Sequence, residues 1–330
     1  MQLASAAKAV PVPRTTRAIL VALAVGGAIL FVIQFTIREL SQDSAQFITI
    51  ALNGLTLASL YFLAASGFTL IFGLLRVVNL AHGAFFLLGG YIGYEVAQSS
   101  GNWFLAAAAG AGAIAFLGVV SQQVILRRLQ GQELREALVT LGLSIIIADL
   151  ALATWGGQPV DIQTPSGLAG ATNIHVAGLL YPSFRLFVLA LAIGVGIGLY
   201  LLLKYTRTGY IIRAGVDDRP MVAALGFNVQ LVFAAVFALG AALVGFSGVV
   251  GGSYLSLAPG EDGRYLLYSL IVVIVGGMGS VTGAAIGAVL VGLVDQFAAV
   301  YVPTYSVLVT FGLLVLVLAV RPTGLLGRAA

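Results

Sequence analysis

Long apolar runs separated by short polar segments dominate the chain. A helix needs about 20 apolar residues to cross the roughly 30 Å hydrocarbon layer of a membrane. Runs of suitable length are 18–37, 47–75, 80–97, 103–126, 137–155, 186–203, 231–251 and 306–320. A longer run, 265–300, is interrupted by Gly276-Gly277-Met278-Gly279. The pattern predicts an all-α integral membrane protein with about eight transmembrane helices and a broken or re-entrant segment near 265–300.

Composition supports a membrane protein. Hydrophobic residues make up 60% of the 330 residues and charged residues 8%, whereas soluble domains carry about 25% charged residues. The 42 glycines suit close packing of transmembrane helices. Cysteine is absent, which excludes disulfides, thiol catalysis and thiolate metal sites.

The positions of the cations predict the orientation. With the N-terminus inside, only Arg38, Arg185 and Arg264 of the 16 Lys and Arg residues face outside, which leaves 13 on the cytoplasmic side. This asymmetry follows the positive-inside rule, so both termini are predicted to be cytoplasmic. The same topology predicts a cytoplasmic tail at 1–17 and a single transmembrane domain at 18–328. Within that domain lie an external loop at 156–185 and a cytoplasmic loop at 204–228.

Enzyme motifs are missing from the sequence. A phosphate-binding loop requires Lys directly after Gly, and neither Lys8 nor Lys204 follows a glycine. The two histidines, His82 and His175, lie far apart without metal-ligand spacing. We therefore predict no catalytic residues, no metal and no cofactor bound by this chain. The net charge is only +4, and the positions of the cations follow the membrane topology. The charge therefore indicates no nucleic-acid partner.

Polar residues and a glycine break inside the apolar runs are candidates for a solute pathway, because polar groups in hydrocarbon are costly. The candidates are Asn53, Asn79, His82, Gly83, Gly276, Gly277 and Gly279. Non-helical backbone at membrane depth survives only where protein or a water-filled cavity covers it, which is typical of transport routes. A structural role stays open for each candidate: a bond between helices, a helix cap or a simple kink.

The predicted cytoplasmic loop contains an amphipathic segment. Asp217 or Asp218 can cap a helix that has Pro220 in its first turn, and Gly226 supplies a stop. The apolar face of this helix consists of Met221, Ala224 and Leu225. We expect a protein surface to cover that face; contact with lipid headgroups is the alternative.

Four segments together resemble the permease subunits of bacterial branched-chain amino acid ABC importers. The first contains Asn53-Gly54-Leu55-Thr56, Phe68-Thr69-Leu70-Ile71-Phe72-Gly73 and Asn79-Leu80-Ala81-His82-Gly83. The second contains Arg213-Ala214, Asp217-Asp218, Ala223 and Leu225-Gly226. The third contains Gly276-Gly277-Met278-Gly279-Ser280 and Gly283-Ala284-Ala285-Ile286-Gly287, and the fourth is Arg321-Pro322-Thr323-Gly324-Leu325-Leu326-Gly327. The segments occur in the family's order from about residue 50 to residue 328, and residues 1–45 and 156–184 carry no part of the resemblance.

The resemblance implies a multi-pass permease of the bacterial inner (plasma) membrane that moves branched-chain amino acids from periplasm to cytoplasm. It implies a second, homologous permease subunit, two cytoplasmic ABC ATPase subunits that use the ATP, and a periplasmic substrate-binding protein. The residues implied in ATPase coupling are Gly209, Arg213, Ala214, Asp217, Asp218, Met221, Ala223, Leu225 and Gly226. Because substrates in this family extend to other amino acids, small amides and urea, a permease for urea or short amides is the alternative.

A stand-alone secondary transporter or channel is a further alternative. Ion coupling requires titratable or cation-binding groups within the membrane, and the sequence offers only Asp149, Asp295 and His82. No Pro follows an Asn anywhere in the chain, so the Asn-Pro-Ala motif of aquaporins is absent. The sequence therefore favours the ABC permease.

Overall fold

The computed structural model describes residues 44–75, 78–168, 173–176, 179–217 and 219–327. The predicted tail at 1–17 and the predicted first helix at 18–37 lie outside the described residues. The chain divides into two units, residues 1–47 and 48–330, and the description below concerns the second unit.

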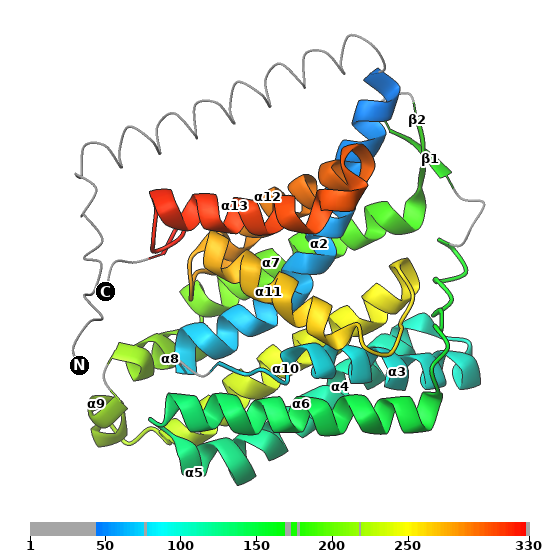
Figure 1. The fold of residues 1–330 in the computed structure, drawn as a ribbon. Helices are drawn as coiled ribbons and strands as arrows, with labels where there is room; N and C mark the ends of the chain where they lie inside the picture. The colour runs from blue at the N-terminus through cyan, green and yellow to red at the C-terminus, as the bar shows by residue number, and fades with distance from the viewer. Residues whose placement is uncertain (1–43, 76–77, 169–172, 177–178, 218, 328–330) are drawn as a thin grey trace, which may run out of the picture. The chain divides into compact units, whose positions relative to one another are not determined.

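Helices make up almost all of the described chain (Figure 1). In order they are α2 (Ser44–Leu75), α3 (His82–Ser100), α4 (Trp103–Val120), the π-helix η1 (Ser121–Leu126), α5 (Arg127–Leu129), α6 (Glu133–Trp155), α7 (Ser183–Tyr205), α8 (Arg207–Asp217), α9 (Arg219–Ala224), α10 (Val229–Tyr254), α11 (Asp262–Gly276), α12 (Val281–Tyr301), the 3-10 helix η2 (Pro303–Tyr305) and α13 (Ser306–Val320). Two short strands, β1 (Asn173–Val176) and β2 (Leu179–Pro182), form an antiparallel hairpin between α6 and α7.

Seven helical stretches within the described ranges are long and apolar enough to cross a membrane. They are Ser44–Gly73, Trp103–Leu129, Glu133–Trp155, Ser183–Tyr205, Val229–Tyr254, Val281–Tyr301 and Pro303–Val320. The prediction of an all-α integral membrane protein is confirmed. The predicted crossing helix at 80–97 corresponds to α3, which is not one of these seven stretches.

Short polar side chains start several of these helices. The side chain of Asn102 accepts hydrogen bonds from the backbone N–H groups of Phe104 and Leu105 at the start of α4. Asn228 caps α10, and Ser280 caps α12 by accepting from Gly283 N at 3.0 Å. Each cap satisfies backbone donors that the first turn of a helix leaves unpaired.

Glycines let the central helices approach closely. A Cβ added to Gly89 of α3 would lie 2.4 Å from Gly245 Cα of α10. A Cβ on Gly110 of α4 would lie 2.6 Å from Gly89 O, and one on Gly67 of α2 would lie 2.3 Å from Gly240 O of α10. Larger residues cannot replace these glycines without moving backbone, as expected where small residues line helix interfaces in membranes.

The predicted break at Gly276-Gly277-Met278-Gly279 is confirmed, and it forms the turn of a helical hairpin. α11 ends at Gly276, and α12 begins at Val281. Gly276 faces Gly283, and further from the turn Gly287 faces Val272 O, so the two helices run antiparallel. The hairpin explains the break by close backbone contact.

α3 begins deep along α2. The first residue of α3, His82, lies 3.0 Å through its Nε2 from Ala64 O. Ala64 is 11 residues before the end of α2 at Leu75, which corresponds to about 16 Å along the helix. The start of the predicted helix at 80–97 therefore lies beside the middle of α2, and the non-helical residues 78–81 precede it.

Candidate functional site

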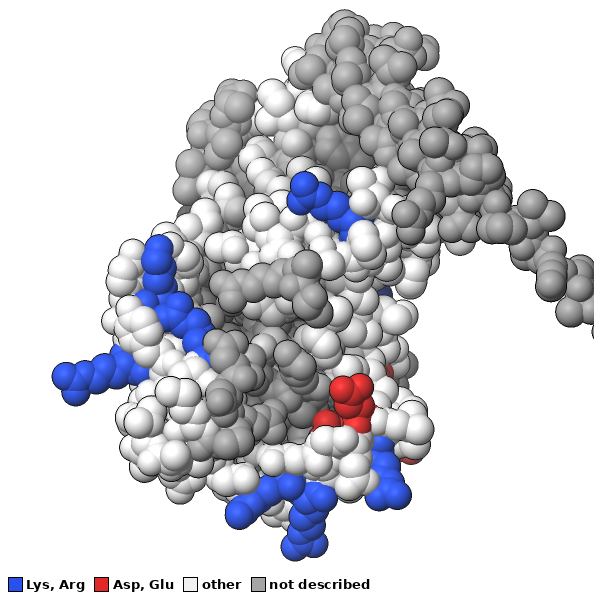
Figure 2. All heavy atoms as spheres, turned by 90° about the vertical axis from the view of Figure 1, so that its left-hand side faces the viewer, with Lys and Arg blue, Asp and Glu red and all other residues white. Residues whose placement is uncertain are grey.

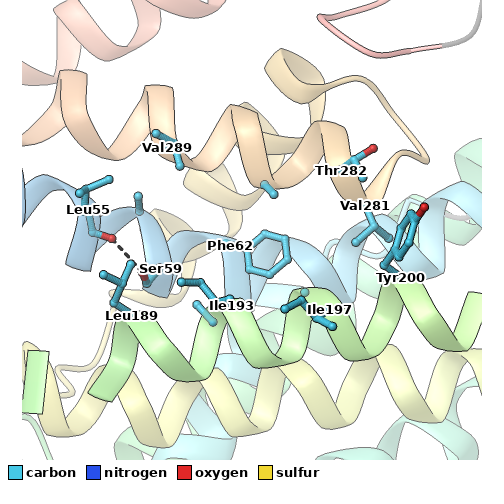
Figure 3. Close-up of a pocket in the computed structure, with 14 residues that line it drawn as sticks. Leu55, Ser59, Phe62, Leu189, Ile193, Ile197, Tyr200, Val281, Thr282 and Val289 are labelled. Atoms are coloured by element: carbon cyan, nitrogen blue, oxygen red, sulfur yellow. Dashed lines mark hydrogen bonds between the residues drawn. The ribbon is translucent and has the colours of Figure 1, made fainter. Parts of the chain in front are cut away.

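An apolar groove of about 350 Å³ lies between α2, α7 and α12. Figure 3 shows Leu55, Ser59 and Leu189 at one end of the groove and Tyr200 and Thr282 at the other. Every described residue that lines the groove is uncharged, and Ser59, Tyr200 and Thr282 supply its polar side chains. Such a groove suits an aliphatic side chain better than a polar solute.

Asn53 lies beside the Leu55 end of this groove, in a cluster of polar and aromatic side chains. Its Oδ1 accepts hydrogen bonds from Arg185 Nη1 and from the Tyr181 hydroxyl, the latter at 3.0 Å. The Tyr181 hydroxyl also lies 3.1 Å from Thr56 Oγ1. The guanidinium of Arg185 lies 5.7 Å from the ring centre of Tyr181 and 5.5 Å from that of Tyr254.

Asp295 of α12 holds four helices together through one buried carboxyl group. Tyr61 of α2 donates to its Oδ2 at 2.8 Å, and Tyr268 of α11 donates to its Oδ1 at 2.9 Å. Thr310 of α13 donates to Oδ1 at 3.1 Å, and the rings of Tyr61 and Tyr268 stack with centres 4.5 Å apart. Asp295 thus has internal hydrogen-bond partners, which argues for a structural role.

Asn79, His82 and Gly83 come together at the start of α3. Asn79 Oδ1 accepts from Ala81 N at 3.1 Å and so stabilises the turn that leads into the helix. His82 is 1% exposed, and its ring packs edge-on against Phe68. A Cβ on Gly83 would lie 1.9 Å from Asp262 O, so α3 and α11 begin in direct contact. None of the three residues lines the groove.

The glycines of the hairpin turn pack against the ends of two other segments. A Cβ on Gly73 of α2 would lie 2.5 Å from Gly279 Cα, and one on Gly277 would lie 2.2 Å from Gly327 N. The C-terminal segment donates Leu325 N to Val275 O and Leu326 N to Gly276 O, both at 2.9 Å. Three of the four segments in the sequence resemblance therefore meet at this turn.

The segment 204–228 forms two helices, where the sequence predicted one. α8 is anchored to the end of α7, because a Cβ on Gly209 would lie 2.4 Å from Leu202 O and Leu203 O. Arg213 Nη2 also donates to Lys204 O at 3.5 Å. α9 ends at Ala224, and the predicted stop residue Gly226 follows at φ +85°. Ile212 is buried, so one face of α8 is fixed against the protein.

The other face of this segment is apolar and exposed. Tyr210 is 58% exposed, Met221 is 60% exposed and Leu225 is 65% exposed. Ala214 and Ala223 are also exposed. Asp217 ends α8, and Asp218 lies outside the described residues. Exposed large apolar side chains beside charged residues are typical of a surface that meets another protein.

Lys and Arg side chains gather on the face of the molecule that carries α8 and α9 (Figure 2). The described cations of the elements at this end are Arg127, Arg128, Arg135, Lys204, Arg207, Arg213 and Arg321. The β1–β2 hairpin lies at the opposite end of α7 (Figure 1). This distribution supports the predicted assignment of the α8–α9 end to the cytoplasm.

The described residues contain no group of three or more His, Asp or Glu side chains that could hold a metal ion. Asp149, a candidate for ion coupling, is exposed on α6. Among the described residues, the carboxyl group of Asp295 is hydrogen-bonded to Tyr61, Tyr268 and Thr310 and not to Asp149 or His82.

Sequence reasoning missed several partners. Tyr61, Tyr268 and Thr310 are far apart in the chain and carry no motif, so only the fold reveals their contact with Asp295. For Arg185 the sequence predicted only a position on the external side. A half-buried arginine one helical turn from an apolar groove is visible only in three dimensions.

Comparisons with known proteins agree with these features. Residues 50–318 match the family described as branched-chain amino acid transport system / permease component. The permease protein BraD of Pseudomonas aeruginosa, from a high-affinity branched-chain amino acid transport system, is 31% identical over 291 residues, which cover 84% of this chain and 94% of BraD. The corresponding LivH of Salmonella typhimurium is 29% identical over 306 residues, covering 88% of this chain and 98% of LivH.

A more distant relative comes from an archaeon. The probable branched-chain amino acid transport permease protein LivH of Methanocaldococcus jannaschii is 23% identical over 291 residues, which cover 82% of this chain and 89% of that protein. No solved structure matches the chain significantly. The family match spans most of the sequence, including the groove, the hairpin turn and the α8–α9 segment. The chain therefore belongs to the family of branched-chain amino acid transport permeases.

Proposed function

We propose that this chain is a membrane-spanning permease subunit of an ATP-driven ABC importer that moves branched-chain amino acids from periplasm to cytoplasm. Separate ATPase subunits supply the energy, and a second, homologous permease completes the transmembrane part. A periplasmic binding protein delivers the amino acid. The protein resides in the bacterial inner membrane with its α8–α9 end in the cytoplasm.

The exposed α8–α9 segment is the observation that carries this proposal. It is fixed to the protein through Gly209, Ile212 and Arg213, while Tyr210 and Leu225 project outward. A rigidly anchored helix pair can pass a movement of a docked ATPase to the transmembrane helices. The face that contacts the ATPase and the face that packs against α7 belong to the same short segment. Docking of an ATPase on this face couples ATP binding and hydrolysis to rearrangement of the helices.

The apolar groove supports branched-chain amino acids as the substrate. Its lining by Phe62, Ile193 and Val289 is suited to aliphatic side chains. Urea and short amides have no aliphatic side chain to bury, so the groove favours leucine, isoleucine and valine over them.

Substitution of the exposed face tests the coupling. The variant Met221→Glu with Leu225→Glu places two carboxylates on the proposed docking face, and we expect it to abolish leucine uptake by cells. ATPase subunits that co-purify with the wild-type chain are expected to be lost, because burying unpaired charges at an interface is costly.

Leu134→Glu is the matched control. Leu134 is 74% exposed near the start of α6 and lies outside the α8–α9 segment. We expect this variant to keep both uptake and co-purification. Unchanged leucine uptake in the double variant, at equal abundance in the membrane, would contradict docking of an ATPase on this face.

A further inference from the structure

Arg185 is a half-buried cation that pairs with no acidic side chain among the described residues. In the part of the chain that the structure describes, the one ion pair joins Arg264 and Glu261. Arg185 instead contacts Asn53 Oδ1 and the rings of Tyr181 and Tyr254. One of its five N–H donors is used by Asn53, so several remain to bind a carboxylate in the two-pronged geometry that guanidinium favours. A positioned, unneutralised guanidinium calls for an anionic ligand.

Arg185 stands at the start of one stripe along α7. Residues three or four apart share a helix face, and Leu189, Ile193, Gly196, Tyr200 and Lys204 follow Arg185 at this spacing. The four residues from Leu189 to Tyr200 line the groove. The stripe therefore begins and ends on a cation, with an apolar wall between the two.

The groove is longer than one amino acid. Leu189 and Tyr200 are 11 residues apart, which corresponds to about 16 Å of helix. Lys204 is exposed one turn beyond Tyr200, and its Nζ donates to the Tyr200 hydroxyl at 2.6 Å. The wall is uncharged along its whole length and has a cation beyond each end. These features suit a route along which a small molecule moves better than a pocket that holds the molecule in one place.

We propose that the α7 stripe forms a wall of the substrate route, with Arg185 binding the α-carboxylate of an aliphatic amino acid at the outer end of the groove. This inference rests on the proposed function. Asn53 and the two tyrosines hold the guanidinium in position, and the aliphatic side chain of the substrate lies against Leu189 and Ile193. Lys204 attracts the carboxylate toward the opposite end. Charge and polarity together favour this occupant, because Arg185 can pair with the carboxylate while the uncharged wall accommodates an aliphatic side chain.

Cysteine labelling in the assembled importer tests the route. The chain contains no cysteine, so Ile193→Cys provides a single reactive thiol in this subunit, and its modification is read by mass spectrometry. The probe is a membrane-impermeant, anionic methanethiosulfonate applied to proteoliposomes that hold the complete importer. Leu308→Cys is the matched control, because Leu308 is 67% exposed on α13 and outside the groove.

We expect Ile193→Cys to react about tenfold faster than Leu308→Cys, because ionised reagents avoid surfaces that face hydrocarbon. Excess leucine should slow the reaction at Ile193→Cys. Leucinol, which has a hydroxymethyl group in place of the carboxylate, should not slow it. No reaction at Ile193→Cys would assign the groove to lipid or to a packed subunit interface and overturn the proposal.

Arg185 variants test the carboxylate contact on the same reporter. With Arg185→Gln, Ile193→Cys should still react faster than Leu308→Cys, which shows an intact groove, although its own rate falls because the anionic reagent loses an attracting cation. The leucine concentration that halves this rate should rise about tenfold. Arg185→Lys should keep part of the protection by leucine, because lysine retains the positive charge but lacks the paired N–H donors of the guanidinium group. Arg264→Gln is the control and should keep the full protection by leucine.

Protection that survives Arg185→Gln, or equal protection by leucine and leucinol, would contradict the assignment. In either case the wild-type importer would still take up leucine with ATP, so the proposed function would stand while the route fails. Absence of ATP-driven leucine uptake by the wild type would instead reject the proposed function itself.

Discussion

The hydroxyl group of Tyr61 lies 2.8 Å from Asp295 Oδ2 and joins α2 to α12 in the interior of the molecule. Tyr268 and Thr310 donate to the other oxygen of the same carboxyl group. Asp295 is 6% exposed and Tyr61 is 3% exposed. Because the buried acceptor has all of its partners on other helices, these bonds fix how α2, α11, α12 and α13 pack together.

We predict that Tyr61→Phe destabilises the protein by about 1–3 kcal/mol, because the substitution leaves a buried acceptor with one donor fewer. The thermal midpoint of the purified protein in detergent should fall measurably. Tyr91→Phe is the matched control, since the Tyr91 hydroxyl is buried with no hydrogen-bond partner within the described part of the chain. Its removal should be neutral or slightly stabilising. Equal effects of the two substitutions would rule out a special role for the Asp295 contacts.

We predict that Gly83→Ala destabilises the protein by about 1–3 kcal/mol, because a methyl group at this position overlaps backbone and forces a shift. The added Cβ would lie 1.9 Å from Asp262 O, where α3 and α11 begin. Gly112→Ala on α4 is the comparison, since a Cβ there meets nothing within 4 Å, and it should raise stability slightly. A Gly83→Ala protein with an unchanged thermal midpoint would contradict the packing of these two helices.

We predict that Gly277→Ala releases the C-terminal segment from the hairpin turn. Gly277 has φ +107°, and its Cβ would lie 2.2 Å from Gly327 N. Hydrogen exchange of the Leu325 and Leu326 amides, which donate to Val275 O and Gly276 O, should become faster. Gly312→Ala, where a Cβ meets nothing within 4 Å, should leave these amides protected. Slow exchange in Gly277→Ala would show that the segment is held elsewhere.

We predict that His82→Leu leaves the KM of leucine uptake within about twofold of wild type and costs about 1 kcal/mol of stability through the lost bond to Ala64 O. His82 Nδ1 has no hydrogen-bond partner among the described residues, so its replacement removes an unsatisfied group as well. Uptake kinetics at matched expression provide the measurement. A KM raised about tenfold at normal thermal stability would instead place His82 on the substrate route.

The fold class and the helix break could be predicted from the sequence because both depend on local pattern. The apolar runs matched seven candidate spans, and the Gly276-Gly277-Met278-Gly279 turn was located correctly. The position of the α3 start beside the middle of α2 could not be predicted, because it depends on a tertiary contact, His82 with Ala64 O, that no local pattern encodes.

The candidate site was predictable only where a motif spans neighbouring residues. The α8–α9 segment carries such a motif, and its apolar residues Met221 and Leu225 are exposed. The stripe from Arg185 to Lys204 is also local in sequence. The other sides of the groove come from α2 and α12, which are far away in the sequence. Helix periodicity shows which residues share a face and does not show what that face meets.

Reconstitution tests whether this permease works as a subunit of an ATP-driven importer. The complex that co-purifies with the chain is inserted into proteoliposomes with its binding protein, and uptake of labelled leucine is measured with and without ATP at the ATPase side. We expect a second permease and two ATPases to be recovered with the chain, and we expect leucine uptake to require ATP hydrolysis. Uptake by the chain alone, driven by an ion gradient without ATP, would contradict it.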